Sequence, residues 1–231
     1  MSGTLWKLLR PDWTSLEEVL PEGSGKALDI GAGNGRHRRI IEDAGYRWTG
    51  CDTAATRGDG VIEADAHHLP FDDNTFDLAV IWQVMEYLRD PWKAVEEISR
   101  VLTPGGILIG SASFLEPMHG RVYFNFSQYG LEEILKNSGF GEILLWPGIG
   151  CFPLISWTWV RQLTGSDTLA RSALWGARVG VWGMSLVVRS LSSVRRLLRL
   201  GGGSKNRWLR ETAPYHFAGQ ITFRATKRIG V

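Results

Sequence analysis

The stretch Lys26-Ala-Leu-Asp-Ile-Gly-Ala-Gly-Asn-Gly-Arg36 decides the fold of this chain. Its first five residues form a short apolar segment typical of a strand, three glycines follow at alternate positions, and residues 36–44 have the pattern of a helix. Glycines between a strand and a helix let the backbone turn sharply and approach a ligand, and free N–H groups at the helix start can hold an anionic group. The motif predicts a nucleotide-binding loop, with an ordinary tight turn as the alternative.

Strands and helices alternate on both sides of this loop. Further strands are predicted over 46–52, 61–64, 76–82, 107–111, 142–146 and 219–226. Further helices are predicted over 12–20, where Thr14 or Ser15 would cap the first turn, and over 92–102 and 131–138. This order indicates an α/β fold with a doubly wound, mostly parallel sheet, and the alternating polarity of 219–226 indicates an edge or antiparallel last strand.

An acidic residue ends the second predicted strand. Asp52 follows Asp29 at the interval expected in a dinucleotide-binding βαβ unit, where a carboxylate accepts hydrogen bonds from both ribose hydroxyls. The glycines alone are weak evidence, whereas the glycines together with Asp52 indicate a nucleoside-containing cofactor.

Residues 27–106 resemble the class I S-adenosylmethionine-dependent methyltransferases, in particular the group typified by the ubiquinone and menaquinone methyltransferases. The motifs that carry the resemblance are Leu28-Asp-Ile-Gly-Ala-Gly-Asn-Gly35, Gly50-Cys-Asp52, Asp65-Ala66 before Leu69-Pro-Phe71, Phe76-Asp-Leu78 and Leu102-Thr-Pro-Gly-Gly106. The similarity covers residues 26–145 and the final strand. It implies a Rossmann-like fold and S-adenosylmethionine as the cofactor.

The resemblance also assigns cofactor-binding residues. They are Asp29, Gly31, Gly33, Gly35, Asp52, Asp65, Ala66, His67 and Gln83. The glycines would lie against the methionine part, whose amino group Asp29 would help hold. Asp52 would hold the ribose. Asp65 would accept a hydrogen bond from the adenine amino group, and His67 or Leu69 would cover the ring.

Two other functions remain as alternatives. An NAD-dependent oxidoreductase also has a glycine-rich loop followed by an acid, but no Tyr-x-x-x-Lys pair or comparable hydride-transfer arrangement is present. A non-catalytic subunit that binds S-adenosylmethionine is the second alternative. Its support is that Gln83 and Tyr87 replace both histidines of the His-x-Leu-Glu-His pattern that relatives often carry.

Two residues are candidates for the catalytic chemistry. Glu86 keeps the acid of that pattern, and His119 follows the fifth predicted strand in a loop that crosses the acceptor pocket in relatives. Imidazole titrates near neutral pH and could take a proton from the acceptor. A structural Glu86 and a surface His119 are the alternatives. With these candidate bases, transfer to oxygen or carbon is favoured over transfer to nitrogen.

The segment from Phe114 to Gly139 has a partial resemblance to methyltransferases of sugar and cell-surface glycan pathways. In that resemblance Tyr123, Phe124 and Phe126 could wall an acceptor pocket, although plain packing is the alternative. The predicted acceptor is therefore a small molecule, lipid-like or glycan-related. Its identity is not determined by the sequence.

The charge is divided unevenly along the chain. Residues 1–150 hold 13 Lys and Arg against 22 Asp and Glu, whereas residues 151–231 hold 13 against 2. Residues 151–210, rich in Trp and Arg, are predicted to be a helical insertion in a single domain spanning 1–231. One helix over 168–200 would place four arginines, at 171, 178, 189 and 196, in one stripe. It could cap the acceptor side or lie on an anionic membrane surface.

Other features of the sequence argue against a membrane-spanning, nucleic-acid-binding, metal-binding or secreted protein. The longest uncharged run of the insertion is half the length of a membrane span, and no recognised nucleic-acid-binding module is present. Cys51 and Cys151 match neither a disulfide framework nor a zinc site, so no metal is predicted. The N-terminus lacks a secretory pattern, which predicts a cytoplasmic protein, peripheral to the inner membrane face if the insertion binds lipid. The oligomeric state is not predicted.

Overall fold

A computed structural model describes residues 15–53, 60–116, 121–148 and 218–230, with isolated positions between 156 and 176. The chain divides into two compact units. One contains Thr14–Phe114, Met118–Leu145 and Ile221–Val231, and holds most of the described residues. The other contains Met1–Trp13, Leu115–Pro117 and Trp146–Gln220. The single domain with an insertion over 151–210 stays a prediction.

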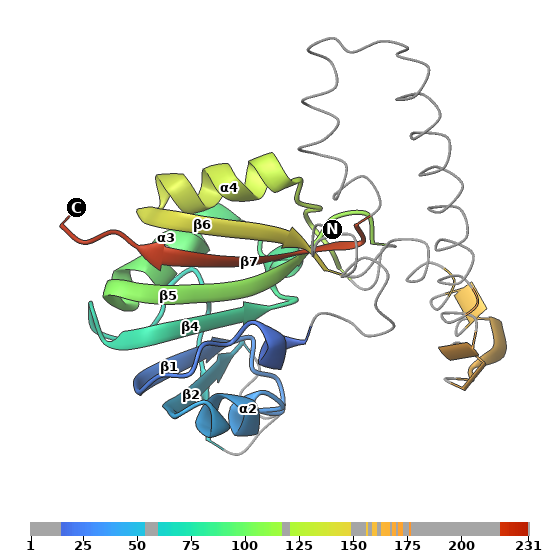
Figure 1. Cartoon of the computed structure of the whole chain (residues 1–231), viewed down its shortest axis with the longest axis horizontal. Helices are drawn as coiled ribbons and strands as arrows, with labels where there is room; N and C mark the ends of the chain where they lie inside the picture. The colour runs from blue at the N-terminus through green and yellow to red at the C-terminus, as the bar shows by residue number, and fades with distance from the viewer. Residues whose placement is uncertain are drawn as a thin grey trace, which may run out of the picture. The chain divides into compact units, whose positions relative to one another are not determined.

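A seven-stranded sheet forms the centre of the first unit, in the order β3-β2-β1-β4-β5-β7-β6. The strands are β1 (Gly25–Ile30), β2 (Tyr46–Asp52), β3 (Val61–Glu63), β4 (Phe76–Trp82), β5 (Leu102–Ser113), β6 (Phe140–Pro147) and β7 (Gln220–Lys227). The neighbours from β3 to β5 are parallel, and β7 runs antiparallel beside β5 (Figure 1). The predicted fold class is confirmed.

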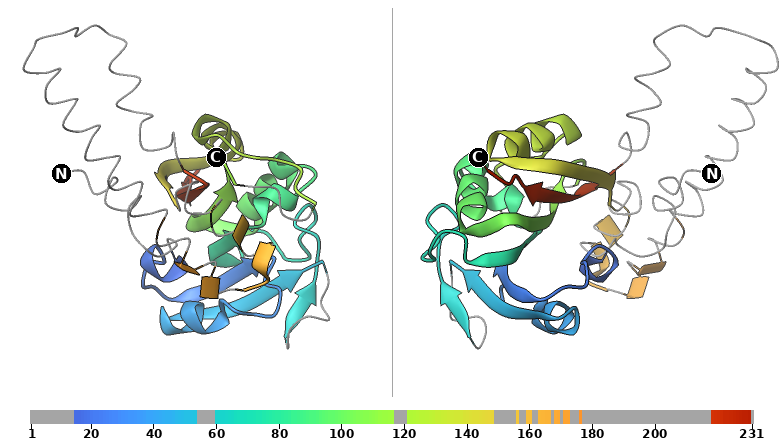
Figure 2. Two further views of the ribbon diagram at one scale, coloured as in Figure 1. Left: turned by 90° about the vertical axis from the view of Figure 1, so that its right-hand side faces the viewer. Right: turned by 60° about the vertical axis from the view of Figure 1, so that its left-hand side comes forward.

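Helices cover both faces of this sheet. They are the 3-10 helices η1 (Leu16–Glu18) and η3 (Met85–Tyr87) and the α-helices α2 (Arg38–Asp43), α3 (Pro91–Val101) and α4 (Gln128–Asn137). Figure 2 shows α2 on one side, and α3 and α4, which contact each other, on the other. Leu16 of η1 and Ile41 of α2 pack with Ala27, Leu78 and Val80 of the sheet in one buried cluster.

The central strands follow from their composition. The side chains of Leu78, Ala79, Val80 and Ile81 in β4 are all fully buried, as expected for a parallel strand covered on both faces. The strand order switches direction between β1 and β4, and open α/β sheets bind ligands at the carboxyl ends of the strands at such a point.

Three local predictions need correction. In 15–20, the described part of the helix predicted over 12–20, only the three residues of η1 are helical, and Ser15 makes no side-chain capping bond. The helix predicted from 36 begins at Arg38, because the turns of the loop continue past Gly35 and His37 occupies the N-cap position without a side-chain capping bond. The strand predicted over 107–111 begins at Leu102, so that residues 103–106 lie inside β5, where a register shift against β4 accommodates them.

The helix predicted over 168–200 lies almost entirely outside the described residues, of which 168–169, 171–172 and 176 are helical. Within the described part of the chain, no helix has both the length and the apolar character needed to cross a membrane.

Candidate functional site

The glycine loop lies between β1 and α2 and turns through left-handed backbone. Gly31, Gly33 and Gly35 have φ values of +70°, +57° and +75°, a region that side chains disfavour. The backbone N–H groups of Gly31 and Ala32 donate to the carbonyl oxygen of Cys51, at 2.8 and 3.0 Å. The loop is thereby attached to the end of β2.

Asp52, the last residue of β2, points back at this loop. Its Oδ2 accepts a hydrogen bond from the backbone N–H of Gly33 at 3.0 Å. The side chain is half-buried. The two sequence motifs, separated by a helix along the chain, therefore form one structure at the carboxyl edge of the sheet.

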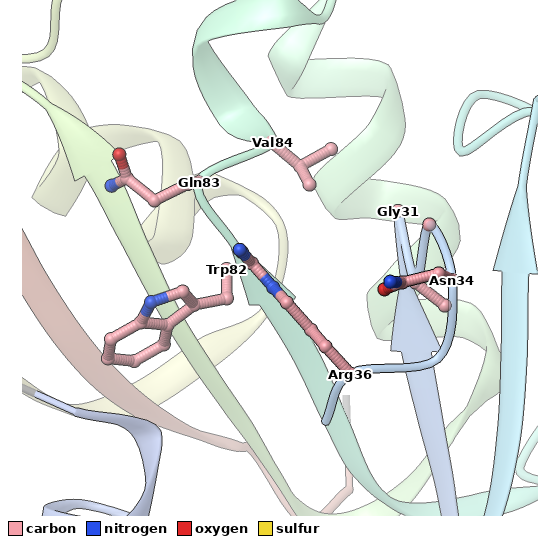
Figure 3. A pocket seen from close by; sticks show the side chains of 8 residues that line it. Gly31, Asn34, Arg36, Trp82, Gln83 and Val84 are labelled. Carbon is pink, nitrogen blue, oxygen red and sulfur yellow. The ribbon is translucent and has the colours of Figure 1, made fainter. Parts of the chain in front are cut away.

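Two hollows adjoin at this edge and share Gly31, Gly33, Gln83 and Val84. The larger, of about 560 Å³, is also lined by Asp52, Asp65, Ala66 and His67. The smaller, of about 490 Å³, is also lined by Asn34, Arg36 and Trp82 (Figure 3). Each volume lies in the range of a site for one small ligand. Gly35 lines neither hollow, and a Cβ there would contact Trp48 instead.

Asp65, which lines the larger hollow, is held in place by its neighbour His67. Asp65 Oδ1 accepts from the backbone N–H of His67 at 3.0 Å and from its ring Nδ1. The hydrogen bond from the backbone of His67 is the main reason that the pKa of Asp65 lies below its usual range. The bond from the His67 ring lowers this pKa further. His67 Nε2 accepts from the backbone N–H of Asp90 at 3.2 Å, so its proton sits on Nδ1. Of the two residues predicted to cover the adenine ring, His67 lines the hollow, while Leu69 is buried elsewhere.

Gln83 follows β4 and lines both hollows. Its φ is +57°, which is rare for a residue other than glycine. The backbone N–H of Gln83 donates to the carbonyl oxygen of Ser111 at 3.0 Å, and its Nε2 donates to the hydroxyl of Ser111 at 2.7 Å. These bonds to β5 hold the unusual conformation, and strain of this kind is often found at functional sites.

Known proteins match the chain in sequence and in fold. The methyltransferase domain family matches residues 28–110. An uncharacterised protein of Methanocaldococcus jannaschii is 36% identical over 145 residues, which are 56% of this chain and 70% of that protein. A demethylmenaquinone methyltransferase of Paenarthrobacter aurescens is 37% identical over 102 residues, 40% of each chain.

The chain belongs to the class I S-adenosylmethionine-dependent methyltransferases. A phosphoethanolamine N-methyltransferase of Haemonchus contortus, solved with S-adenosylmethionine, has a similar fold. Its TM-score is 0.55 at 18% identity, with 98% of this chain and 52% of that chain covered. The chain spans about half the length of several curated relatives it matches.

One residue of the family's first motif has an unexpected environment in this methyltransferase. Asp29 is fully buried and lines neither hollow. Its Oδ2 accepts from Trp48 Nε1 at 3.2 Å, and its Oδ1 lies 3.3 Å from His37 Nδ1. Arg36, His37 and Trp48 were not predicted to belong to the site. The only signal was that Arg36 and His37 directly follow the loop.

Of the two predicted catalytic residues, the structure describes only Glu86. Glu86 is fully buried in η3 and lines neither hollow. Its Oε1 accepts from the hydroxyl of Ser113 at 3.2 Å, and its backbone carbonyl accepts from the N–H groups of Tyr123 and Phe124. His119 lies outside the described residues.

The aromatic segment after β5 is partly packing and partly exposed. Phe126 is buried, and Phe124 packs edge-on against Trp92 with ring centroids 6.1 Å apart. Tyr123 is exposed, and its hydroxyl accepts from Arg89 Nε at 3.2 Å. Because Arg89 lines the larger hollow, Tyr123 lies next to the site.

Metal ligands do not gather in this region. Among the residues that the structure describes, no three His, Cys, Asp or Glu side chains are arranged to hold a metal ion.

Proposed function

We propose that this chain transfers the methyl group of S-adenosylmethionine to a small-molecule acceptor. The observation that carries the proposal is the pair of adjoining hollows at the carboxyl ends of β1, β2 and β4. A methyl transfer needs a donor and an acceptor side by side, and two hollows that share the glycine loop meet that need.

The residues present fit the cofactor. A Cβ at Gly33 would have no heavy atom within 4 Å, so space remains above the loop for the methionine part beside Gly31 and Gly33. In the proposal, Asp52 accepts from the ribose hydroxyls, Asp65 accepts from the adenine amino group, and His67 covers the ring beside Ala66. When bound, the sulfonium supplies an activated methyl group.

The protein's own contribution is chiefly positioning. Gln83, which lines both hollows and is tied to β5, would fix the boundary between donor and acceptor. Holding two reactants in line lowers the activation barrier by removing the entropy of their encounter, and shielding the site excludes water. In the proposal, Glu86 holds the segment of Tyr123 and Phe124 against η3.

We expect the acceptor to be a small, lipid-like or glycan-related molecule, methylated on oxygen or carbon ahead of nitrogen, with His119 as the candidate base. Substitution of His119 by Ala should then lower turnover and remove an ionisation from the pH profile of kcat. An unchanged profile would contradict a role for His119.

The proposal for residues 151–210 rests on their charge. They would cover the acceptor side or contact an anionic membrane. Sedimentation with vesicles of anionic lipid at low salt tests the second arrangement, which should weaken as salt rises. Absence of binding at low salt would exclude it.

The test of the proposed function is calorimetric titration with S-adenosylmethionine, S-adenosylhomocysteine and NAD, followed by an assay for S-adenosylhomocysteine formation with mixed acceptors. Binding of the first two ligands but not NAD is expected. NAD binding alone would overturn the proposal. Cofactor binding without product, over a wide acceptor set, would favour the non-catalytic subunit.

A further inference from the structure

Arg36 presents a positive charge to the smaller hollow. It follows the glycine loop, and its side chain extends toward the side of Trp82 and Gln83 in Figure 3. Among the described residues that line this hollow, it is the only charged one. No carboxylate of the described chain lies within ion-pair distance of its guanidinium, whereas its neighbours Arg38 and Arg39 each pair with an acid of α2.

A series of hydrogen bonds through the buried side chains of His37 and Asp29 holds Arg36 in place. Arg36 Nε donates to His37 Nε2 at 3.0 Å. A ring nitrogen that accepts carries no proton, so the proton of neutral His37 is on Nδ1 and points to Asp29 Oδ1 at 3.3 Å. Trp48 fixes the other oxygen of Asp29. Asp29 is fully buried and His37 is 7% exposed, so these hydrogen bonds are shielded from solvent.

This arrangement leaves the ligand-facing part of the guanidinium available. Nε is used by His37, and the two terminal nitrogens remain to form paired hydrogen bonds. A guanidinium fork matches the two oxygens of a carboxylate or phosphate. Trp82 and the side chain of Asn34 complete a surface that carries no negative charge among its described residues.

We propose that the smaller hollow binds an anionic group of the methyl acceptor, a carboxylate or a phosphate, through Arg36, and that His37 and Asp29 act as positioning residues for Arg36. The inference rests on the proposed function, because it assigns the larger hollow to the cofactor. The volumes support two ligands, since the smaller hollow is itself large enough for one.

The experiment uses the full chain saturated with S-adenosylhomocysteine and titrated with inorganic phosphate or acetate, at constant ionic strength set with chloride. Binding is followed by the ¹H–¹⁵N resonance of the Arg36 Nε–H group, assigned by its loss in Arg36→Gln. We expect phosphate or acetate to shift this resonance. In Arg36→Gln, calorimetry should show binding weakened about tenfold or more. Arg39→Gln, which removes the same charge from an exposed ion pair, is the matched control and should bind normally.

The positioning role is tested by two substitutions of His37. His37→Asn keeps a donor toward Asp29 but loses the acceptor for Arg36, whereas His37→Gln places an amide oxygen where Nε2 lies. We expect anion binding to be weak in His37→Asn and largely restored in His37→Gln. Equal binding in the two variants would overturn the positioning role.

The outcomes separate this inference from the proposed function. Failure of the wild-type chain to bind S-adenosylhomocysteine would count against the proposed function itself. Normal cofactor binding with no anion binding, or equal anion binding in Arg36→Gln, would overturn the inference alone. If Arg36→Gln weakens S-adenosylhomocysteine but not 5′-methylthioadenosine, which lacks the amino-acid part, Arg36 serves the cofactor's carboxylate and the acceptor assignment is wrong.

Discussion

The carboxylate of Asp52 accepts a hydrogen bond at 3.0 Å from the backbone N–H of Gly33. The bond joins the acid at the end of β2 to the middle glycine of the loop after β1. Because both residues line the larger hollow, one carboxylate holds the loop in shape and also faces the ligand. Asp52 is therefore expected to affect cofactor binding in two ways.

Substitution of Asp52 by Ala should weaken S-adenosylmethionine binding by roughly 1–3 kcal/mol, since the ribose hydroxyls and the N–H of Gly33 lose their acceptor. Asp52→Asn should lose less, because the amide oxygen can still accept from Gly33. Calorimetric titration measures both. Asp72→Asn, an exposed carboxylate outside both hollows, is the control. Unchanged affinity in Asp52→Ala would contradict the ribose assignment.

Two glycine substitutions should have different consequences. Gly33→Ala adds a methyl group with no protein atom within 4 Å, so the stability cost should be only the backbone strain of about 1–2 kcal/mol. Cofactor affinity should fall strongly, because the methyl group occupies the space proposed for the methionine part. Gly31→Ala would place its Cβ 2.4 Å from Val84 Cγ2 and should lose more stability. Adding Val84→Ala should recover part of that stability. Urea unfolding measures the loss of stability, and calorimetric titration measures the loss of cofactor affinity. Equal stability of Gly33→Ala and Gly31→Ala would contradict this prediction.

The Glu97–Arg100 pair should make stability depend on acid pH. Arg100 Nε and Nη2 donate to the carboxylate of Glu97, at 3.1 and 2.9 Å, and Nη2 and Nη1 also reach the carbonyls of Leu69 and Phe71. The hydrogen bond from Arg100 is the main reason that the pKa of Glu97 is lowered. Its stabilisation is thus complete above the unfolded pKa of about 4.3 and is lost as pH falls through the lower folded value.

Arg100→Gln should therefore destabilise the protein by roughly 1–3 kcal/mol at pH 7 and by less at pH 3. Urea unfolding across this range measures the difference. Arg39→Gln, which breaks an exposed pair, should change stability little. A penalty for Arg100→Gln that stays constant with pH would contradict the assignment.

Tyr123 should titrate earlier than an ordinary tyrosine. The hydrogen bond from Arg89 lowers the pKa of its phenol, with a smaller contribution from Arg121. Arg89→Gln should raise this pKa toward the usual value of about 10. Ultraviolet titration, with Tyr123→Phe subtracted to isolate the residue, measures the change. No difference between Arg89→Gln and the parent chain would show that this contact does not persist in solution.

Cys51 should be unreactive in the folded protein. Burial raises the pKa of its thiol to about 12, and the Asp29 carboxylate adds to the effect. In a Cys151→Ser background, iodoacetamide at pH 8 should modify Cys51 slowly in buffer and quickly in urea. Stability should also fall as pH rises above the unfolded pKa of about 8.5, because the unfolded thiol ionises first. Fast modification of the folded chain would contradict this.

The sequence by itself determined the layout of the sheet and the place of the site. The bounds predicted for 46–52 and 76–82 are those of β2 and β4. For β4 the reason is a nearly continuous apolar run, which is stable only when both faces of the strand are covered. The glycines and Asp52 predicted a ligand loop, since left-handed backbone and a strand-end carboxylate are local properties. Local pattern failed at 103–106, where pairing with β4 extended the strand across glycines.

The tertiary structure alone decided which side chains face the ligand. Asp29 meets Trp48, 19 residues away, and Gln83 meets Ser111, 28 residues away, because strand register brings them together. Those contacts fix the orientation of Asp29 and hold Gln83 in a left-handed conformation. No sequence pattern encodes such contacts. They arise from packing between strands and loops that are distant along the chain, and packing exists only in the folded protein.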